Sequence, residues 1–332
     1  EWLQVRVPGT FDSYGPGLAH YEGGGWLRRE FVAPASWAGR RVALRCEGAN
    51  YHARVWVNGS LVGENRDGFL PFEFPVHAFL RYGERNVIAL AVDNRRLKDD
   101  VPGEPHGWQN FGGVLREIGL VASDPLHIQR VWVSAEPARE GGSLVVRVWL
   151  ANGRARVARA ALRAAVETSD GTVVGTLESA ALEVAPGAAL PVTLEGSIAG
   201  AQHWSPQSPR LYTIRVTLEE DGKPTDEVSV RTGFRRVEAR GGRLLLNGEP
   251  LFLTGFNRHE DSPRTDMATD LQTVRQDLIA MKEAGANFVR LCHYPHHPRE
   301  LDLCDELGLV AMGEIPLYWW KGNADGEEVC AR

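Results

Sequence analysis

Several features that mark specialised classes of protein are scarce in this chain of 332 residues. Its four cysteines are too few and too scattered for a disulfide framework or for a zinc motif of closely spaced ligands. The net charge of −6 is spread along the chain without a basic stripe, which argues against nucleic acid as a partner. No apolar run approaches the ~20 residues of a membrane-spanning helix. These absences predict a globular protein with reduced thiols and neither a membrane nor a nucleic-acid partner.

The start of the chain and its composition narrow the class further. The opening segment "EWLQVRVPG" has no methionine and neither the basic nor the apolar part of a signal peptide, so we expect a cytoplasmic protein. With 43% hydrophobic residues, 36 glycines and 19 prolines, the chain is typical of a globular protein rich in turns. Its length exceeds one ordinary domain and predicts two or three.

Residues 1–124 have the pattern of a β-sandwich. Short segments such as "RVALRCEG" and "HARVWVNG" alternate apolar and polar residues, which places Val55 and Val57 on one face of a strand. Turn signals such as Asn58-Gly59 separate these segments. We expect loops at "GFLPFEF" and "HGWQNFGG", where aromatic and polar residues interrupt the alternation.

Residues 125–233 contain longer strands, including "SLVVRVWLANG", "ALPVTLEG" and a hairpin that turns at Asp221-Gly222. A proline-rich segment, "WSPQSPRLY", connects two of them, and no cluster of ionisable residues stands out. The pattern predicts an immunoglobulin-like β-sandwich of about seven strands.

Residues 234–332 combine strands with helices. We predict strands at "LFLTGFN", "NFVRLCH" and "LVAMGEI", and helices at "TDLQTVRQDLIAMKEAG" and "PRELDLCDELG". A capping box of Thr269 and Gln272 is expected to start the first helix, and Gly285 to end it. The second helix is expected to begin at Pro298 and to end at Gly308. This order predicts a parallel βαβαβ unit.

The polar residues of this unit follow its predicted strands. His259 and Glu260 come after the first strand, Arg290 and His293 end the second, and Glu314 ends the third. Reactive groups lie at these strand ends in a (β/α)₈ barrel, which needs ~250 residues. We therefore expect residues 234–332 to form the N-terminal part of a TIM barrel that is cut at its C-terminal side.

Motifs throughout the chain resemble those of glycoside hydrolase family 2, the group of β-galactosidases, β-glucuronidases and β-mannosidases. The motifs are "VPGTF", "WLRREF", "VWVNG", "NFGGVLREIGL", "WSPQSPRLY", "RTGFRRVE", "LLLNGEPLFLTGFNRHED" and "NFVRLCHYPHHPRELDLCDELGL". The resemblance implies a multidomain protein with a jelly-roll sugar-binding domain at 1–124, an immunoglobulin-like domain at 125–233 and an incomplete catalytic TIM barrel at 234–332.

Members of this family are retaining β-glycosidases, in which two glutamates roughly 5 Å apart act as acid/base and nucleophile. The resemblance places both glutamates beyond Arg332, because each follows a later strand of the barrel. Glu327 and Glu328 have the pattern of loop carboxylates. We therefore expect β-galactosidase or β-glucuronidase activity from a full-length protein and none from this chain.

The resemblance assigns supporting roles to residues that are present in the barrel part. Arg290 matches an arginine that hydrogen-bonds the nucleophile, although an arginine here could also pair with a barrel carboxylate. His259 and His293 match histidines that contact sugar hydroxyls. Asn257 and Glu260, in the same "FNRHED" motif as His259, are further candidates for binding the substrate or supporting the site.

The first domain also offers candidates. Asn50 falls where β-galactosidases place a sugar-contacting asparagine, although asparagine at a strand end is also a common turn former. Gly107 stands where family members use an aspartate to recognise the sugar, which departs from the galactosidase pattern. Trp108 could stack on a sugar or serve as a packing anchor.

We predict no metal ion and no cofactor. The motif "HYPHHP" contains His293, His296 and His297, but proline disrupts the spacing of zinc ligands and no carboxylate partner is evident. The Glu-x-His pair that binds magnesium in the family is replaced by Tyr318 and Trp320.

Two other functions remain open at this point. A non-catalytic carbohydrate-binding module on an immunoglobulin-like stalk would explain why catalytic carboxylates are missing, and a structural array of β-sandwiches would explain the first two domains. The capped βαβαβ unit argues against the array. The residues do not distinguish galactose, glucuronate and mannose as the sugar. Family members usually form dimers or tetramers, which implies a homo-oligomer.

Overall fold

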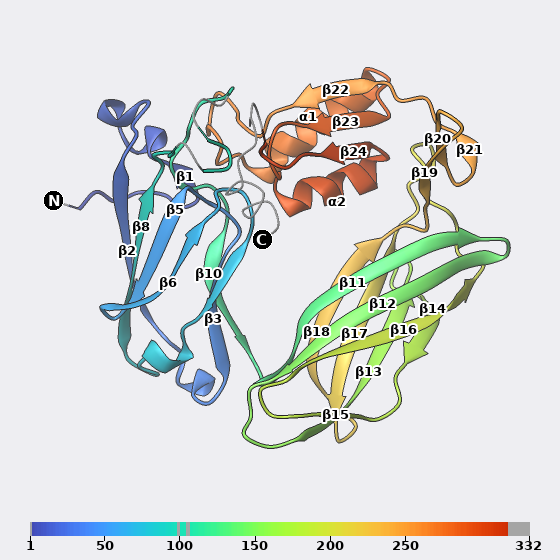
Figure 1. Ribbon diagram of the computed structural model, residues 1–332, viewed down its shortest axis with the longest axis horizontal. Helices are drawn as coiled ribbons and strands as arrows, with labels where there is room; N and C mark the ends of the chain where they lie inside the picture. Colours follow the sequence, from blue (N-terminus) through green and yellow to red (C-terminus); the bar gives the residue numbers. More distant parts are fainter. Residues whose placement is uncertain (1, 98–99, 104–106, 318–332) are drawn as a thin grey trace.

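The computed structural model describes residues 2–97, 100–103 and 107–317. Two β-rich regions and one α/β region follow each other along the chain, and Figure 1 shows the α/β region next to both β-rich regions. This architecture confirms the predicted fold class, which is a β-sandwich, an immunoglobulin-like sandwich and the first part of a TIM barrel.

The first region is an antiparallel β-sandwich. Its strands are β1 (Gly9–Thr10), β2 (Gly24–Val32), β3 (Arg41–Cys46), β4 (Ala49–Asn50), β5 (His52–Val57), β6 (Ser60–Arg66), β7 (Phe72–Pro75), β8 (Arg85–Asp93), β9 (Gly113–Val114) and β10 (Ile118–Ser123). Short 3₁₀ helices η1 to η4 cover Asp12–Tyr14, Pro16–Leu18, Ala35–Trp37 and His77–Phe79. The strand orders are β2-β8-β5-β6, β10-β3-β7 and β1-β9-β4. Val55 and Val57 face the buried core, as their alternation predicts.

One predicted loop of this region contains a strand. We expected a loop throughout "GFLPFEF", but β7 pairs with β3 there, with Phe72 opposite Cys46 and Phe74 opposite Leu44. The prediction was wrong because the aromatic and polar residues of this segment interrupt the alternation typical of a strand. The strand β7 lies at the edge of its sheet, where proline is tolerated because no further strand needs its missing N–H.

The second region is a sandwich of two antiparallel sheets. Its strands are β11 (Leu126–Ala138), β12 (Gly141–Asn152), β13 (Ala158–Glu167), β14 (Val173–Glu178), β15 (Leu182–Val184), β16 (Ala189–Ala199), β17 (Tyr212–Glu220) and β18 (Lys223–Thr232). One sheet has the order β11-β12-β16, and the other has β14-β13-β17-β18 with β15 beside β13. The predicted hairpin at Asp221-Gly222 is confirmed, because both residues have positive φ, 51° and 73°, as a type I′ turn requires.

The third region begins with a small antiparallel sheet and continues as the βαβαβ unit. The small sheet contains β19 (Val237–Arg240), β20 (Arg243–Leu246) and β21 (Glu249–Pro250). The unit contains β22 (Gly255–Arg258), α1 (Leu271–Glu283), β23 (Phe288–Leu291), α2 (Pro298–Leu307) and β24 (Val310–Gly313). Its strands are parallel in the order β22-β23-β24, and apolar residues of both helices pack on them.

Two local predictions in this region need correction. The strand predicted at 251–257 begins only at Gly255, because Leu251 still bonds to Leu244 of the preceding sheet. The N-cap of α1 is Asp270, not Thr269, and its side chain accepts a hydrogen bond from the backbone N–H of Thr273. The Thr269 hydroxyl instead donates to the carbonyl oxygen of Glu260, a contact that sequence spacing does not reveal.

The other helix boundaries agree with the sequence. Gly285, directly after the C-cap of α1, has a φ of +90°. Pro298 is the first residue of α2, and Gly308 ends that helix with a left-handed φ of +71°. Such positions favour proline and glycine for purely local steric reasons.

The three regions are joined by specific contacts. A small apolar cluster links the first region to the third, and its members are Phe69, Phe111, Leu115, Met267 and Tyr294. The second region meets helix α2, where the indole nitrogen of Trp204 donates to the carbonyl oxygen of Asp305. Arg231 of β18 pairs with Glu306 of the same helix at 2.5 Å. The apolar cluster thus holds the α/β region against the first region, and the other two contacts hold helix α2 against the second region.

Candidate active site

Parallel pairing brings the polar residues after β22, β23 and β24 to one edge of the sheet. Arg258 lies opposite Leu291, and Leu291 lies opposite Gly313. The next residue of each strand therefore reaches the same level, namely His259, Cys292 and Glu314. This edge is the C-terminal one, where TIM barrels carry their reactive groups.

Glu314 connects two of the predicted site residues. Its Oε1 accepts a 2.6 Å hydrogen bond from Nε of Arg290, and its Oε2 lies 3.1 Å from Nδ1 of His293. Burial alone would raise the pKa of Glu314, but the hydrogen bonds from Arg290 and His293 outweigh it and lower that pKa. Glu314 is thus held as a carboxylate. Arg290 was predicted either to hydrogen-bond the nucleophile or to pair with a barrel carboxylate. Among the described residues, Glu314 is such a carboxylate partner.

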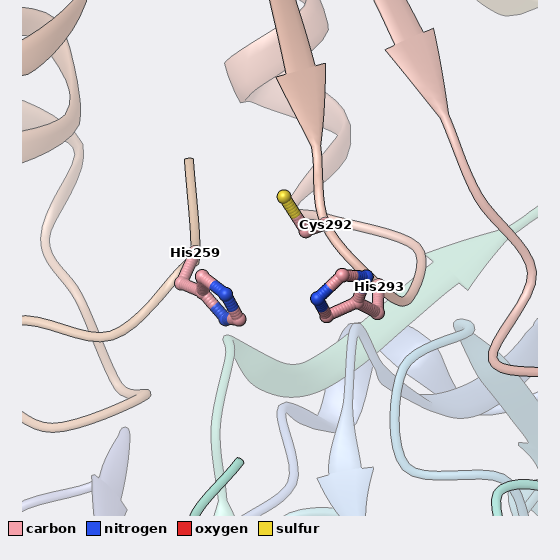
Figure 2. Close-up of side chains that lie close together, drawn as sticks. All are labelled: His259, Cys292 and His293. Atoms are coloured by element: carbon pink, nitrogen blue, oxygen red, sulfur yellow. The ribbon is translucent and has the colours of Figure 1, made fainter. Parts of the chain in front are cut away.

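His259 faces His293 across the strand ends. The ring centroids of the two imidazoles are 5.1 Å apart at an interplanar angle of 78°. Figure 2 shows both rings together with Cys292, which precedes His293. Burial lowers the pKa of His259, opposed in part by Asp261, so the ring is neutral at neutral pH. A neutral imidazole can both donate and accept a hydrogen bond, which suits contact with hydroxyl groups.

Asn257, another barrel candidate, lies on the exposed side of β22. Its Oδ1 is 3.5 Å from Nη1 of Arg290, a long contact that places it beside the Arg290–Glu314 pair. Asn257, Arg290, His293 and His259 are therefore gathered at one end of the sheet.

Glu260 has a different environment from these residues. Its side chain is only 5% exposed, and its Oε2 is 2.7 Å from Nη2 of Arg116 in the first region. Its Oε1 accepts from the backbone N–H of His297. Both carboxylate oxygens thus bind protein groups, and the geometry indicates that Glu260 ties the first region to the loop after β23.

Aromatic residues of the first region cover this loop. Trp108 stacks on His293 with ring centroids 5.9 Å apart and also contacts Tyr294. Phe69 stacks on Tyr294 at 4.4 Å. The first region therefore forms one wall beside the strand ends, and Trp108 serves here as a packing residue against the imidazole.

Asn50 is buried within the first region. Its Oδ1 accepts from Arg96 at 2.6 Å, and its Nδ2 donates to the carbonyl oxygen of Phe111 at 2.7 Å. It belongs to β4 and forms no turn. These bonds support the loop that carries Trp108, and its predicted contact with a sugar stays a prediction.

The histidines of "HYPHHP" do not gather around one point. His296 lies between Glu300 and the carbonyl oxygen of Cys292, at 3.1 Å and 2.8 Å. His297 bonds to Glu117 of the first region through Nε2 and caps helix α2 through Nδ1. Only His293 of the three lies with His259, so the sequence grouping does not correspond to a cluster in space.

Sequence reasoning missed two residues of this site. Arg116 lies in the motif "NFGGVLREIGL" between Leu115 and Glu117, and no local pattern marks it as a partner of the strand ends. Cys292 has no local signal beyond that of a scattered thiol, but it directly follows β23 and precedes His293. The predicted residues Tyr318, Trp320, Glu327 and Glu328 lie outside the described residues.

A cavity of about 550 Å³ lies between the first two regions, beside His77, Tyr82 and His127. The residues that line it include none from the C-terminal ends of β22, β23 and β24, so it is separate from the candidate site.

In the described part of the chain, no helix is long and apolar enough to span a membrane.

Comparison with known families matches three consecutive parts of the chain to one family. Residues 2–124 match the sugar binding domain of glycosyl hydrolases family 2, residues 126–235 match a second domain of that family, and residues 237–321 match its TIM barrel domain.

Individual relatives agree with this match. A β-galactosidase of Thermoanaerobacter pseudethanolicus is 32% identical over 309 residues, which are 92% of this chain and 41% of the relative. A β-glucuronidase of Paenibacillus borealis is 29% identical over 95% of this chain and 54% of its own length. The structure of Bacteroides uniformis β-glucuronidase 2, covalently bound to cyclophellitol-6-carboxylate aziridine, matches with a TM-score of 0.86 and 30% identity, covering 95% of this chain and 39% of that one. The chain thus spans about half or less of the length of these relatives.

Proposed function

Because this chain belongs to glycosyl hydrolase family 2, we propose that it forms the sugar-facing part of a retaining β-glycosidase that removes terminal β-linked galactose or glucuronate. The observation that carries the proposal is the group of Arg290, His293 and Glu314 at the C-terminal strand ends, with His259 opposite. Charged and imidazole side chains at this end of a barrel are suited to binding a polar substrate.

Each residue of the group has a proposed role. His259 and His293 hydrogen-bond sugar hydroxyls, and Asn257 lies beside them. Arg290, already oriented by Glu314, stabilises the ionised nucleophile when the barrel is complete. Trp108 holds the ring of His293 in place by stacking on it.

We assign the acid/base and the nucleophile to barrel strands other than β22, β23 and β24. A retaining glycosidase needs two carboxyl groups about 5 Å apart on either side of the scissile bond. Two described carboxylates near the strand ends are already bound: Glu260 by Arg116, and Glu314 by Arg290 and His293. Neither is placed as a free acid. Asp261 is exposed in the loop after β22.

The test uses the 332-residue chain with chromogenic aryl β-galactoside, β-glucuronide and β-mannoside, together with NMR titration of the matching methyl glycosides. We expect binding of the β-galactoside or the β-glucuronide without turnover of any of the three. His259→Ala and His293→Ala should each weaken binding about five-fold, since a neutral hydrogen bond contributes ~1 kcal/mol. His52→Gln is the matched control, because His52 lies on β5 within the first region and pairs with Glu64 of β6; it should bind as the unmodified chain does.

Two outcomes would contradict the proposal. Turnover that Glu314→Gln abolishes would make Glu314 a catalytic residue and overturn the assignment of the glutamates to other strands. Sugar binding that is equally strong in His293→Ala and His52→Gln would place the ligand on the first region alone, as expected of a non-catalytic carbohydrate-binding module.

A further inference from the structure

We propose that His259, Cys292 and His293 form a binding site for a soft or borderline metal ion of the zinc type. The ligand atoms of the three side chains, one from each, all lie within 4.8 Å of one another. They come from the ends of two adjacent strands, β22 and β23, whose register brings His259 and Cys292 to the same level. Figure 2 shows the two imidazoles facing each other, with Cys292 on the same strand end as His293.

The chemistry of this donor set selects the kind of metal. One thiolate and two imidazole nitrogens are typical ligands of Zn²⁺ and of copper, whereas Mg²⁺ and Ca²⁺ prefer oxygen ligands. Metal–ligand bonds of ~2.0–2.3 Å in a tetrahedral site separate the donor atoms by about 3.3–3.6 Å. A spread of 4.8 Å therefore closes with side-chain movements of about 1 Å.

A carboxylate behind one ligand is the second observation in favour of the site. Oε2 of Glu314 lies 3.1 Å from Nδ1 of His293. Nη2 of Arg290 lies 3.3 Å from the same nitrogen, farther than the carboxylate oxygen. A carboxylate at Nδ1 favours the tautomer with the proton there and the lone pair on Nε2, which is the arrangement commonly found behind metal-bound histidines. The fourth ligand of a three-residue zinc site is usually a water molecule or a substrate group.

Charge at the site is compatible with a dication. Glu314 offsets the positive charge of Arg290, to which it is bound at 2.6 Å. The Cys292 thiol donates a long hydrogen bond of 3.5 Å to the Arg290 carbonyl oxygen. On binding, that thiol releases its proton to solvent and the sulfur coordinates the metal as a thiolate.

The position of the site has a consequence for sugar binding. His259 and His293 are the residues to which we assign contacts with sugar hydroxyls, so a metal bound by both imidazoles excludes the sugar. This consequence rests on the proposed function, whereas metal binding itself depends only on the three side chains. Zinc is therefore expected to compete with the glycoside.

The experiment titrates the 332-residue chain with Co²⁺, read by the thiolate-to-metal absorption band, and with Zn²⁺, read by calorimetry. We expect one equivalent of either metal to bind and the Co²⁺ spectrum to show a tetrahedral thiolate site. Cys292→Ala should abolish the band and weaken zinc binding by more than ten-fold, and Glu314→Gln should weaken it by about 10–100-fold. His259→Asn, at a half-buried position after the strand, should weaken zinc binding without disturbing a buried core residue.

Cys304→Ala is the matched control, because Cys304 is a buried thiol of helix α2 that belongs to the core of the same region. It should leave the band and the zinc affinity unchanged. A thiolate band that persists in Cys292→Ala, or equal zinc affinity in Cys292→Ala and the unmodified chain, would overturn the metal site. Glycoside binding that zinc does not weaken, in a chain shown to bind zinc at Cys292, would overturn the competition alone.

Discussion

The buried ion pair between Arg116 and Glu260 joins the first region to the strand ends. The two side chains are 2% and 5% exposed, and Nη2 of Arg116 lies 2.7 Å from Oε2 of Glu260. Arg116 also donates to the carbonyl oxygens of Phe69 and Pro295, at 2.5 Å and 2.7 Å. Arg116→Met would keep much of the volume but leave a buried carboxylate without its cation. Breaking a buried pair in this way costs about 3–5 kcal/mol.

The measurement is urea unfolding followed by tryptophan fluorescence, with each transition fitted separately because a chain of several domains need not unfold in one step. Hydrogen exchange of peptides covering residues 255–262 and 291–298 would show whether the loss is local to the junction. Arg116→Met combined with Glu260→Gln should recover part of the stability, since the buried charge is then removed. Arg45→Met is the control, because Arg45 pairs with Glu47 at the surface with its side chain 48% exposed, and such pairs contribute at most about 1 kcal/mol.

Two results would refute this reasoning. If the free energy of unfolding lost in Arg116→Met exceeds that lost in the control by less than about 1 kcal/mol, the Glu260 carboxylate is solvated in the folded chain. A double variant no more stable than Arg116→Met would show that the carbonyl contacts of Arg116, rather than the charge on Glu260, account for the loss.

Three further predictions concern the other junctions and cores. Gly285→Ala should lower the free energy of unfolding by ~1–2 kcal/mol, because alanine is strained in a left-handed conformation. Gly308→Ala should lower it further, because a Cβ there would lie 2.4 Å from the carbonyl oxygen of Pro206, whereas the space around Gly285 is open. Equal shifts in melting temperature would contradict this prediction. Burial raises the pKa of Glu306, but hydrogen bonds from two arginines outweigh it and lower that pKa below its ordinary value of 4.5. The stabilising contribution of Glu306 is therefore present above pH 4.5 and is lost as the pH falls through its lowered folded-state pKa. Glu306→Gln should make the melting temperature fall less steeply with pH on the acid side, and an unchanged acid side would contradict the prediction. Leu150→Ala, in the separate core of the second region, should lower the free energy of unfolding of that region by about 2–5 kcal/mol and shift one unfolding transition only. An equal shift of all transitions would contradict independent cores.

Local features of the chain were predictable because they depend on neighbouring residues. Asp221-Gly222 forms a type I′ turn since both residues tolerate positive φ, and Pro298 and Gly308 bound a helix for reasons of backbone sterics. The alternation of Val55 and Val57 predicted the buried face of β5. The errors also had local causes, since aromatic and polar residues obscured β7 and the capping-box pattern indicated Thr269, one residue before the actual N-cap Asp270.

The position of the candidate site was predictable, but its contacts were not. Strand ends in a βαβαβ unit lie at one edge whatever the side chains are, so His259, Arg290, His293 and Glu314 could be grouped from sequence alone. The pairs that they form depend on the directions of their side chains, which bring the Glu314 carboxylate within hydrogen-bond distance of both Arg290 and His293.

The sequence by itself thus determined the order of the elements, the family, and the strand edge that carries the polar residues, because each follows from patterns within a few tens of residues. Only the tertiary structure decided that Glu260 binds Arg116, 144 residues away in the chain, and that Cys292 lies with two histidines while His296 and His297 point elsewhere. Such contacts depend on how separate regions pack and on the direction in which each side chain leaves its strand, and neither is encoded in the spacing of residues along the chain.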